Sequence, residues 1–222
     1  MLTLEKILGL YIPEEFGCDE CNDITESMDE VIDALDLDSE EYNYGATKFV
    51  IYLNNKEVIK IPFNGEWFYQ YPDDNLEEGW FFDPFQYHKG NYCDKEMELY
   101  AEAEEFGIEQ IFSNIEFVGM SKNDIPIYKS ERVHLFCYDE NEKQSSKEAM
   151  ESVRMMNAEV NRVSSYFNVN WLGNAIDYYG EEFIRKVLKF IDKHGLSDFH
   201  GGNLAYRDNG APVIIDYAGF YH

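Results

Sequence analysis

The sequence predicts an α+β protein, with an antiparallel sheet in its N-terminal half and helices in its C-terminal half. β-Branched and aromatic residues dominate 47–53 and 57–63, and the turn residues Asn54-Asn55-Lys56 separate the two runs, which is the pattern of a hairpin. Farther along, apolar residues recur at helical spacing over about 180–194, and Gly195 ends that pattern. At 222 residues, the chain is long enough for one large core or two small lobes.

The composition excludes several classes of protein. With 45% hydrophobic and 16% aromatic residues, the chain is expected to be globular and not disordered. It has no run of about 18 uncharged apolar residues, the shortest stretch that would predict a membrane span. The N-terminal region is acidic and lacks the basic start of a secretory signal. We therefore expect a cytoplasmic protein with no membrane partner.

The charge balance bears on the partners of the protein. Its 44 acidic and 18 basic residues give a formal net charge of −26, which repels phosphate backbones, so direct binding of nucleic acid is not expected. One interpretation is a solvated, highly soluble surface, and the other is an acidic mimic of nucleic acid that binds a basic protein. Magnesium-bound nucleotide is compatible with this charge, because the ion and a nearby lysine set the local field.

Residues 1–40 are expected to form an acidic helical extension. Apolar residues recur at helical spacing from Ile24 to Leu35, which predicts an amphipathic helix over 23–37. The same region holds Cys18 and Cys21, the two cysteines in Cys-x-x-Cys spacing. Free thiols are the expectation for a cytosolic protein, and a zinc or redox role for the pair is the alternative.

Residues 41–134 are predicted to form the lobe that contains the sheet. A helix over 94–107 is expected to follow the hairpin, and strands at 115–121 and 125–133 then complete a five-stranded sheet. Residues 64–92 are rich in aromatic residues and are interrupted by proline and glycine, which predicts a long structured loop. This aromatic insertion either packs on the lobe or forms a surface for a partner.

Residues 135–222 are predicted to form a smaller, mainly helical lobe. Ser145 and Glu148 have the spacing of a capping box, which predicts a helix that begins there and ends near Tyr166. The segment 196–220 predicts a loop, a short strand, an Asp-Asn-Gly turn, a second short strand and a loop.

The last of these segments carries the strongest candidate site. Asp198 and Asn203 fall in the loop before one short strand, and Asp216 follows the next strand. Because a tight turn joins the two strands, we expect these three side chains to lie close together. Carboxylate and amide oxygens are suitable ligands for Mg²⁺.

The sequence Asp-Phe-His-Gly-Gly-Asn at 198–203 is similar to the Asp-Leu-His-x-Gly-Asn loop of the protein-kinase-like superfamily, in the branch of the aminoglycoside and choline phosphotransferases. With Ile-Ile-Asp-Tyr-x-Gly at 214–219, it also resembles small kinase-like proteins encoded by bacteriophages and mobile elements. The specific match covers about 25 residues, and a looser one covers 45–222. The resemblance implies a truncated bilobal kinase-like fold, with an antiparallel five-stranded N-lobe sheet and a reduced helical C-lobe.

The resemblance implies roles for individual residues. Asp198 would orient or deprotonate the acceptor hydroxyl, whereas Asn203 and Asp216 would bind Mg²⁺. Lys60 would contact the phosphates of ATP, and a carboxylate on the helix over 94–107 would hold it in place. Glu96 is the expected partner of that lysine, and Glu98 is its rival.

Further contacts with the nucleotide also follow from the resemblance. Gly45 would lie in the turn over the phosphates, and backbone groups near Glu131 and Val133 would bind the adenine. His200 has two interpretations, either a residue that tunes the loop or the acceptor, or a structural histidine bonded to a backbone carbonyl.

Two functions are compatible with the resemblance. The first is a phosphotransferase that uses Mg-ATP, with an acceptor that no motif identifies. The alternative is a kinase-like protein with weak or no catalysis that binds a host or partner protein, in a bacterium or a phage-infected cell. The chain ends six residues after Asp216 without an activation segment, so a conventional protein kinase is not expected.

Overall fold

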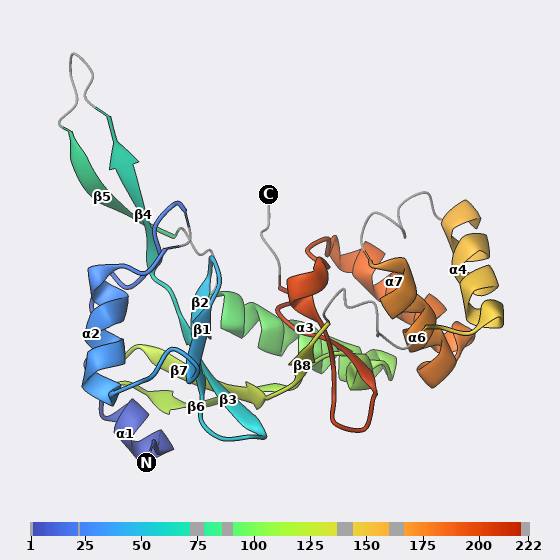
Figure 1. The fold of residues 1–222 in the computed structure, drawn as a ribbon, viewed down its shortest axis with the longest axis horizontal. Coiled ribbons are helices and arrows are strands. Elements are labelled where there is room, and N and C mark those ends of the chain that lie inside the picture. The colour runs from blue at the N-terminus through green and yellow to red at the C-terminus, as the bar shows by residue number, and fades with distance from the viewer. Residues whose placement is uncertain are drawn as a thin grey trace. The chain divides into compact units, whose positions relative to one another are not determined.

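The computed structural model describes residues 2–21, 23–71, 78–85, 91–136, 144–159 and 167–218. These residues form an α+β fold (Figure 1), which divides into two compact units. The first consists of Met1–Asp94 and Ile115–Arg132, and the second of Lys95–Asn114 and Val133–His222. The described residues contain six α-helices, and none of these is long and apolar enough to cross a membrane.

The first unit contains an antiparallel sheet of five strands in the order β1-β2-β3-β7-β6. Its elements in chain order are α1 (Leu4–Leu8), α2 (Glu26–Leu35), β1 (Tyr42–Tyr44), β2 (Lys48–Tyr52), β3 (Glu57–Pro62), β4 (Gly65–Gln70), β5 (Gly79–Pro84), β6 (Ile115–Met120) and β7 (Pro126–Glu131). The predicted hairpin, the amphipathic helix and the five-stranded antiparallel sheet are thereby confirmed.

The core of the first unit lies on one face of this sheet. Alternate residues of β2 and β3, such as Ile51 and Ile59, are fully buried there, as the two-residue period of a strand requires. Met28 and Val31 of α2 belong to the same apolar cluster. The N-terminal helices therefore cover the sheet and share its core.

The prediction of a long loop at 64–92 is wrong for the part of this segment that the structure describes. β4 and β5 pair antiparallel, with Trp67 opposite Phe82 and Tyr69 opposite Trp80. The rings of both pairs pack across the two strands, which stabilises the hairpin. The prediction failed because a continuous aromatic run hides the alternation by which a half-buried strand is recognised.

The hairpin is fixed to the first unit at its base. The backbone of Trp67 donates to the carbonyl of Cys18 at 2.9 Å and accepts from the amide of Glu20 at 2.7 Å. A Cβ on Gly17 would overlap the backbone of Gly65, and a Cβ on Gly65 would overlap the backbone of Asp83. Glycine is therefore required at this crossing.

Cys18, Cys21 and Cys93 form no disulfide with one another, whereas Cys137 lies outside the described residues. Cys18 is buried and Cys21 is exposed. Burial raises the pKa of the Cys18 thiol to about 11.

The second unit combines helices with a small sheet of the order β10-β9-β8. Its elements are α3 (Tyr92–Phe106), the 3-10 helix η1 (Glu109–Ile111), β8 (His134–Leu135), α4 (Lys147–Glu159), α6 (Val169–Tyr179), α7 (Glu181–His194), the 3-10 helix η2 (Gly201–Asn203), β9 (Leu204–Tyr206) and β10 (Pro212–Ile214). The predicted helices over 94–107 and 180–194 are confirmed, as is the strand, turn and strand at the end of the chain.

Two features of the helices differ from the sequence expectation. Helix α6 was not predicted, because Gly173 in its middle weakens the helical pattern. The N-cap of α4 lies one residue later than expected, since the hydroxyl of Ser146 accepts from the amide of Ala149 at 3.0 Å. Ser145 instead donates to the side chain of Asn170. The end predicted for α4, at 160–166, lies outside the described residues.

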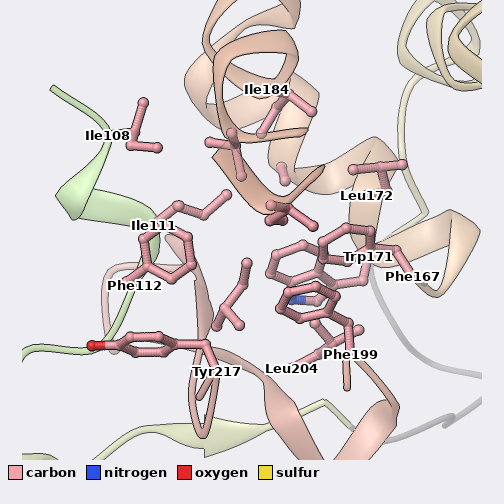
Figure 2. Packing of buried hydrophobic residues seen from close by; sticks show 14 of the residues in the cluster. Ile108, Ile111, Phe112, Phe167, Trp171, Leu172, Ile184, Phe199, Leu204 and Tyr217 are labelled. Carbon is pink, nitrogen blue, oxygen red and sulfur yellow. The ribbon is translucent and has the colours of Figure 1, made fainter. Parts of the chain in front are cut away.

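Three aromatic rings form a stack at the centre of the second core (Figure 2). Phe167 lies between Trp171 and Phe199, with ring centroids 5.6 Å and 4.7 Å away and nearly parallel planes. The indole nitrogen of Trp171 also donates to the carbonyl of Ala205 on β9, at 3.1 Å. Phe199 belongs to the loop of the candidate site, so the stack anchors this loop in the core.

Candidate active site

The loop that carries Asp198 begins where α7 ends. Gly195 takes a left-handed conformation (φ 64°) and stops the helix, as predicted. Phe199 is almost fully buried and fixes the loop from the inside. The side chain of Asp198, immediately before it, is 33% exposed. The buried ring of Phe199 thus holds the loop in place, while the carboxylate of Asp198 beside it remains accessible to solvent.

Asn203 is buried and its amide has a fixed orientation. Its Nδ2 donates to the backbone carbonyl of Asp198 at 2.8 Å, and a carbonyl oxygen only accepts, so the nitrogen must face it. Within the described residues, no donor bonds to Oδ1 of Asn203. That oxygen is therefore a suitable ligand atom for a cation.

The strands β9 and β10 bring the backbone of Asp216 close to Asn203. Ile214 pairs with Leu204, and the amide of Ile215 continues the ladder by donating to the carbonyl of Asn203 at 2.9 Å. Asp216 is the next residue, so its backbone lies beside the turn of η2. The structure thus gathers Asp198, Asn203 and Asp216 within the second unit.

The tight turn between these strands has the predicted form. Gly210 donates to the carbonyl of Arg207 at 2.8 Å and has a φ of 81°. Only glycine adopts this backbone conformation without strain, which explains the Asp-Asn-Gly sequence. The turn sets the register that aligns Asn203 with Ile215.

Asp216 has a strained backbone. Its φ is 55°, in the left-handed region that costs a residue with a side chain about 1–2 kcal/mol. Aspartate and asparagine tolerate this region better than most residues. Strain of this kind persists where the surrounding structure imposes it, and it is concentrated at functional sites.

The residue after Asp216 shows what imposes this conformation. Tyr217 is buried, and its ring lies 4.9 Å from that of Phe112 (Figure 2). Its hydroxyl lies 3.0 Å from the carbonyl of Ser113 and 3.3 Å from that of Glu96. A phenol has one hydrogen to donate, so the two carbonyls share it. Tyr217 thus fixes the chain on one side of Asp216 and β10 fixes it on the other.

Tyr217→Phe is expected to lower the free energy of unfolding by about 1–3 kcal/mol, because two buried carbonyls lose their donor. The measurement is urea unfolding followed by circular dichroism. Tyr178→Phe removes the hydroxyl of an exposed tyrosine in α6, which accepts a long bond from Asn209 at 3.4 Å. It is the matched control and should change stability by less than about 0.5 kcal/mol. Equal stability of the two variants would contradict the proposed anchoring by Tyr217.

His200 is bonded to the backbone, but not to a carbonyl as the structural interpretation expected. Its Nδ1 accepts from the amide of Gly202 at 3.0 Å and so caps η2. Nδ1 therefore carries no proton, and the proton of the neutral ring lies on Nε2. That nitrogen is 3.6 Å from Oδ1 of Asp198, at the edge of the predicted site.

In the first unit, two lysines lie on the face of the sheet that points away from the apolar cluster. Lys60 is 5% exposed and Lys48 is 2% exposed. Lys60 pairs with Val50. Lys48 lies two residues before Val50 on β2, so its side chain is on the same face of the sheet as that of Lys60. Lys48 was not predicted as a buried residue, because a lysine at the start of a strand is usually solvated. Gly45 lies in the turn between β1 and β2, and open space surrounds the position of a Cβ there.

Three hydrogen-bonded side chains, Tyr128, Asp94 and Asn91, belong to the same unit as Lys60. Tyr128 is its partner on β7, and the Tyr128 hydroxyl donates to Oδ1 of Asp94 at 2.5 Å. The side-chain amide of Asn91 donates to the same hydroxyl at 3.0 Å. Burial, and then the bond to Asp94, raise the pKa of Tyr128, so the phenol stays neutral. This face is therefore polar and ordered.

The helix α3 distinguishes the two candidate glutamates by burial. Glu96 is fully buried, whereas the side chain of Glu98 is 55% exposed and pairs with Lys95 at 3.3 Å. Glu131 and Val133, the residues expected to flank the adenine, are both half-buried. Since Glu96 and Lys60 belong to different units, their pairing stays a prediction.

No protein-family model matches the chain, and no curated protein matches it.

Proposed function

We propose that the protein is a kinase-like phosphotransferase that binds Mg-ATP and transfers a phosphoryl group to an acceptor hydroxyl, in the cytoplasm of a bacterium or a phage-infected cell. One observation carries the proposal. Asn203 is tied through Nδ2 to the backbone of Asp198, and the β9 and β10 ladder holds Asp216 beside it in a strained conformation. This arrangement supports the roles that the resemblance implies for the three residues.

The donor atoms fit a magnesium ion. Mg²⁺ prefers oxygen ligands and keeps several waters, so one or two protein ligands suffice. Asp216 would supply a carboxylate oxygen and Asn203 its Oδ1. When bound, the ion would neutralise charge on the phosphate oxygens.

The other residues would position the reactants. Asp198 would accept the proton of the acceptor hydroxyl, and its partial exposure leaves it accessible to that group. Lys60, held by Glu96, would contact the phosphates beneath the turn of Gly45. The backbone near Glu131 and Val133 would bind the adenine.

The test begins with the melting temperature of the intact protein, with and without Mg-ATP. A ligand that binds the folded state raises this temperature, and we expect a rise that EDTA removes. Asp198→Asn should keep the rise but lower phosphate release from ATP by about 10²–10⁴-fold, because only the proton acceptor is lost.

The two alternatives give different results in this assay. Binding of Mg-ATP without turnover in the intact protein would identify a kinase-like protein that acts by binding. If Mg-ATP leaves the melting temperature unchanged, the proposal of a nucleotide site is wrong.

A further inference from the structure

The hairpin of β4 and β5 carries a strip of aromatic rings on one face. Residues opposite each other in an antiparallel pair point to the same side, so Trp67 with Phe82 and Tyr69 with Trp80 form two successive rungs. The ring centroids are 5.4 Å apart in each rung. Tyr71 extends the strip, with its ring 5.2 Å from that of Tyr69.

The outer part of this strip is exposed. The first rung lies at the base, where the indole nitrogen of Trp67 donates to the carbonyl of Glu15 at 3.1 Å. Farther out, Trp80 is 53% exposed and Tyr71 is 76% exposed, on the hairpin that Figure 1 shows extending from the first unit. Adjacent large rings in water are typical of a surface that binds a partner.

Carboxylates border these rings. The hydroxyl of Tyr69 donates to Oε1 of Glu78 at 2.6 Å, and its amide donates to Oε1 of Glu20 at 3.3 Å. By sequence, residues 64–85 contain six acidic residues and no lysine, arginine or histidine. The strip therefore combines aromatic faces with fixed negative charge.

We propose that this strip is a docking surface for an arginine-rich segment of another protein. A guanidinium group stacks on aromatic faces and binds carboxylates through paired N–H groups, so it uses both features of the strip. A nucleic acid would also offer rings for stacking, but its phosphates oppose the charge of the hairpin. A neutral proline-rich segment would use the rings and leave the carboxylates without a partner.

The proposal is tested with the full chain and a dye-labelled peptide of about twelve alternating arginine and serine residues, by fluorescence anisotropy. Trp80→Ala is expected to weaken binding about tenfold, and Glu78→Gln about threefold. A peptide with lysine in place of arginine should bind more weakly, because an ammonium does not stack as a planar group. Circular dichroism verifies that each variant is folded.

Tyr11→Ala is the matched control, since Tyr11 is an aromatic residue of the same unit that is 59% exposed. This variant should bind the peptide within about twofold of the parent. If Trp80→Ala and Tyr11→Ala affect binding equally, the attraction is a general effect of the net charge and the proposal fails. It also fails if a neutral proline-rich peptide binds as tightly as the arginine peptide.

Discussion

Asp216→Asn is expected to abolish the Mg²⁺ dependence of ATP binding while the protein remains folded. Asparagine has the same size as aspartate and also tolerates the left-handed backbone (φ 55°). It lacks the charged oxygen that a magnesium ion prefers. ATP is titrated into the parent and the variant, with and without Mg²⁺. The variant should bind ATP at least about tenfold more weakly than the parent when Mg²⁺ is present, and equally well when it is absent.

Two further variants separate metal binding from backbone strain. Asp216→Gly relieves the strain, so its free energy of unfolding should stay within about 1 kcal/mol of the parent, while the magnesium effect is lost as in Asp216→Asn. Asp192→Asn removes an exposed carboxylate from α7 and should leave ATP binding unchanged. Retention of the full magnesium effect in Asp216→Asn would exclude Asp216 as a metal ligand.

Trp171→Ala is expected to lower the free energy of unfolding by about 3–5 kcal/mol, the range for loss of a large buried aromatic residue. Trp171 is fully buried, stacks on Phe167 and donates to Ala205. The variant loses the ring contacts and leaves a buried carbonyl without its donor. Urea unfolding measures the effect.

Trp80→Ala is the matched control for this variant, because it makes the same chemical change at an exposed tryptophan. It loses one exposed ring pair with Tyr69 and should change stability by no more than about 1 kcal/mol. Trp171→Phe should fall between the two, since it keeps an aromatic ring and loses the hydrogen bond. A cost of less than about 1 kcal/mol for Trp171→Ala would show that the stack does not stabilise the second unit.

Several elements were predictable because local signals determine them. Asn54-Asn55-Lys56 predicted the turn between β2 and β3, and the β-branched and aromatic residues on both sides predicted the two strands. Gly195 and Gly210 have positive φ, as expected for glycine after a helix and in a tight turn. The same turn predicted that Asn203 and Asp216 would lie close together.

Other features depend on contacts that a sequence does not show. Ser145 and Ser146 are equally good caps by type, and the bond from Ser145 to Asn170 decides between them. The β4 and β5 hairpin is stabilised by aromatic pairs across its strands, which no local period reveals. Lys48 is buried although a lysine at the start of a strand is usually solvated, and only the tertiary structure decides this.

In the proposed site, the side chain of Asn203 would have two tasks that an amide combines. Its Nδ2 donates to the carbonyl of Asp198 and closes the loop, and its Oδ1 is an acceptor that would bind an ion. An aspartate would repel that carbonyl, and a leucine would offer neither atom. In the proposed site, cation capture and loop closure would therefore be linked through one bifunctional group, so an ion held by Oδ1 would also restrain the carboxylate of Asp198.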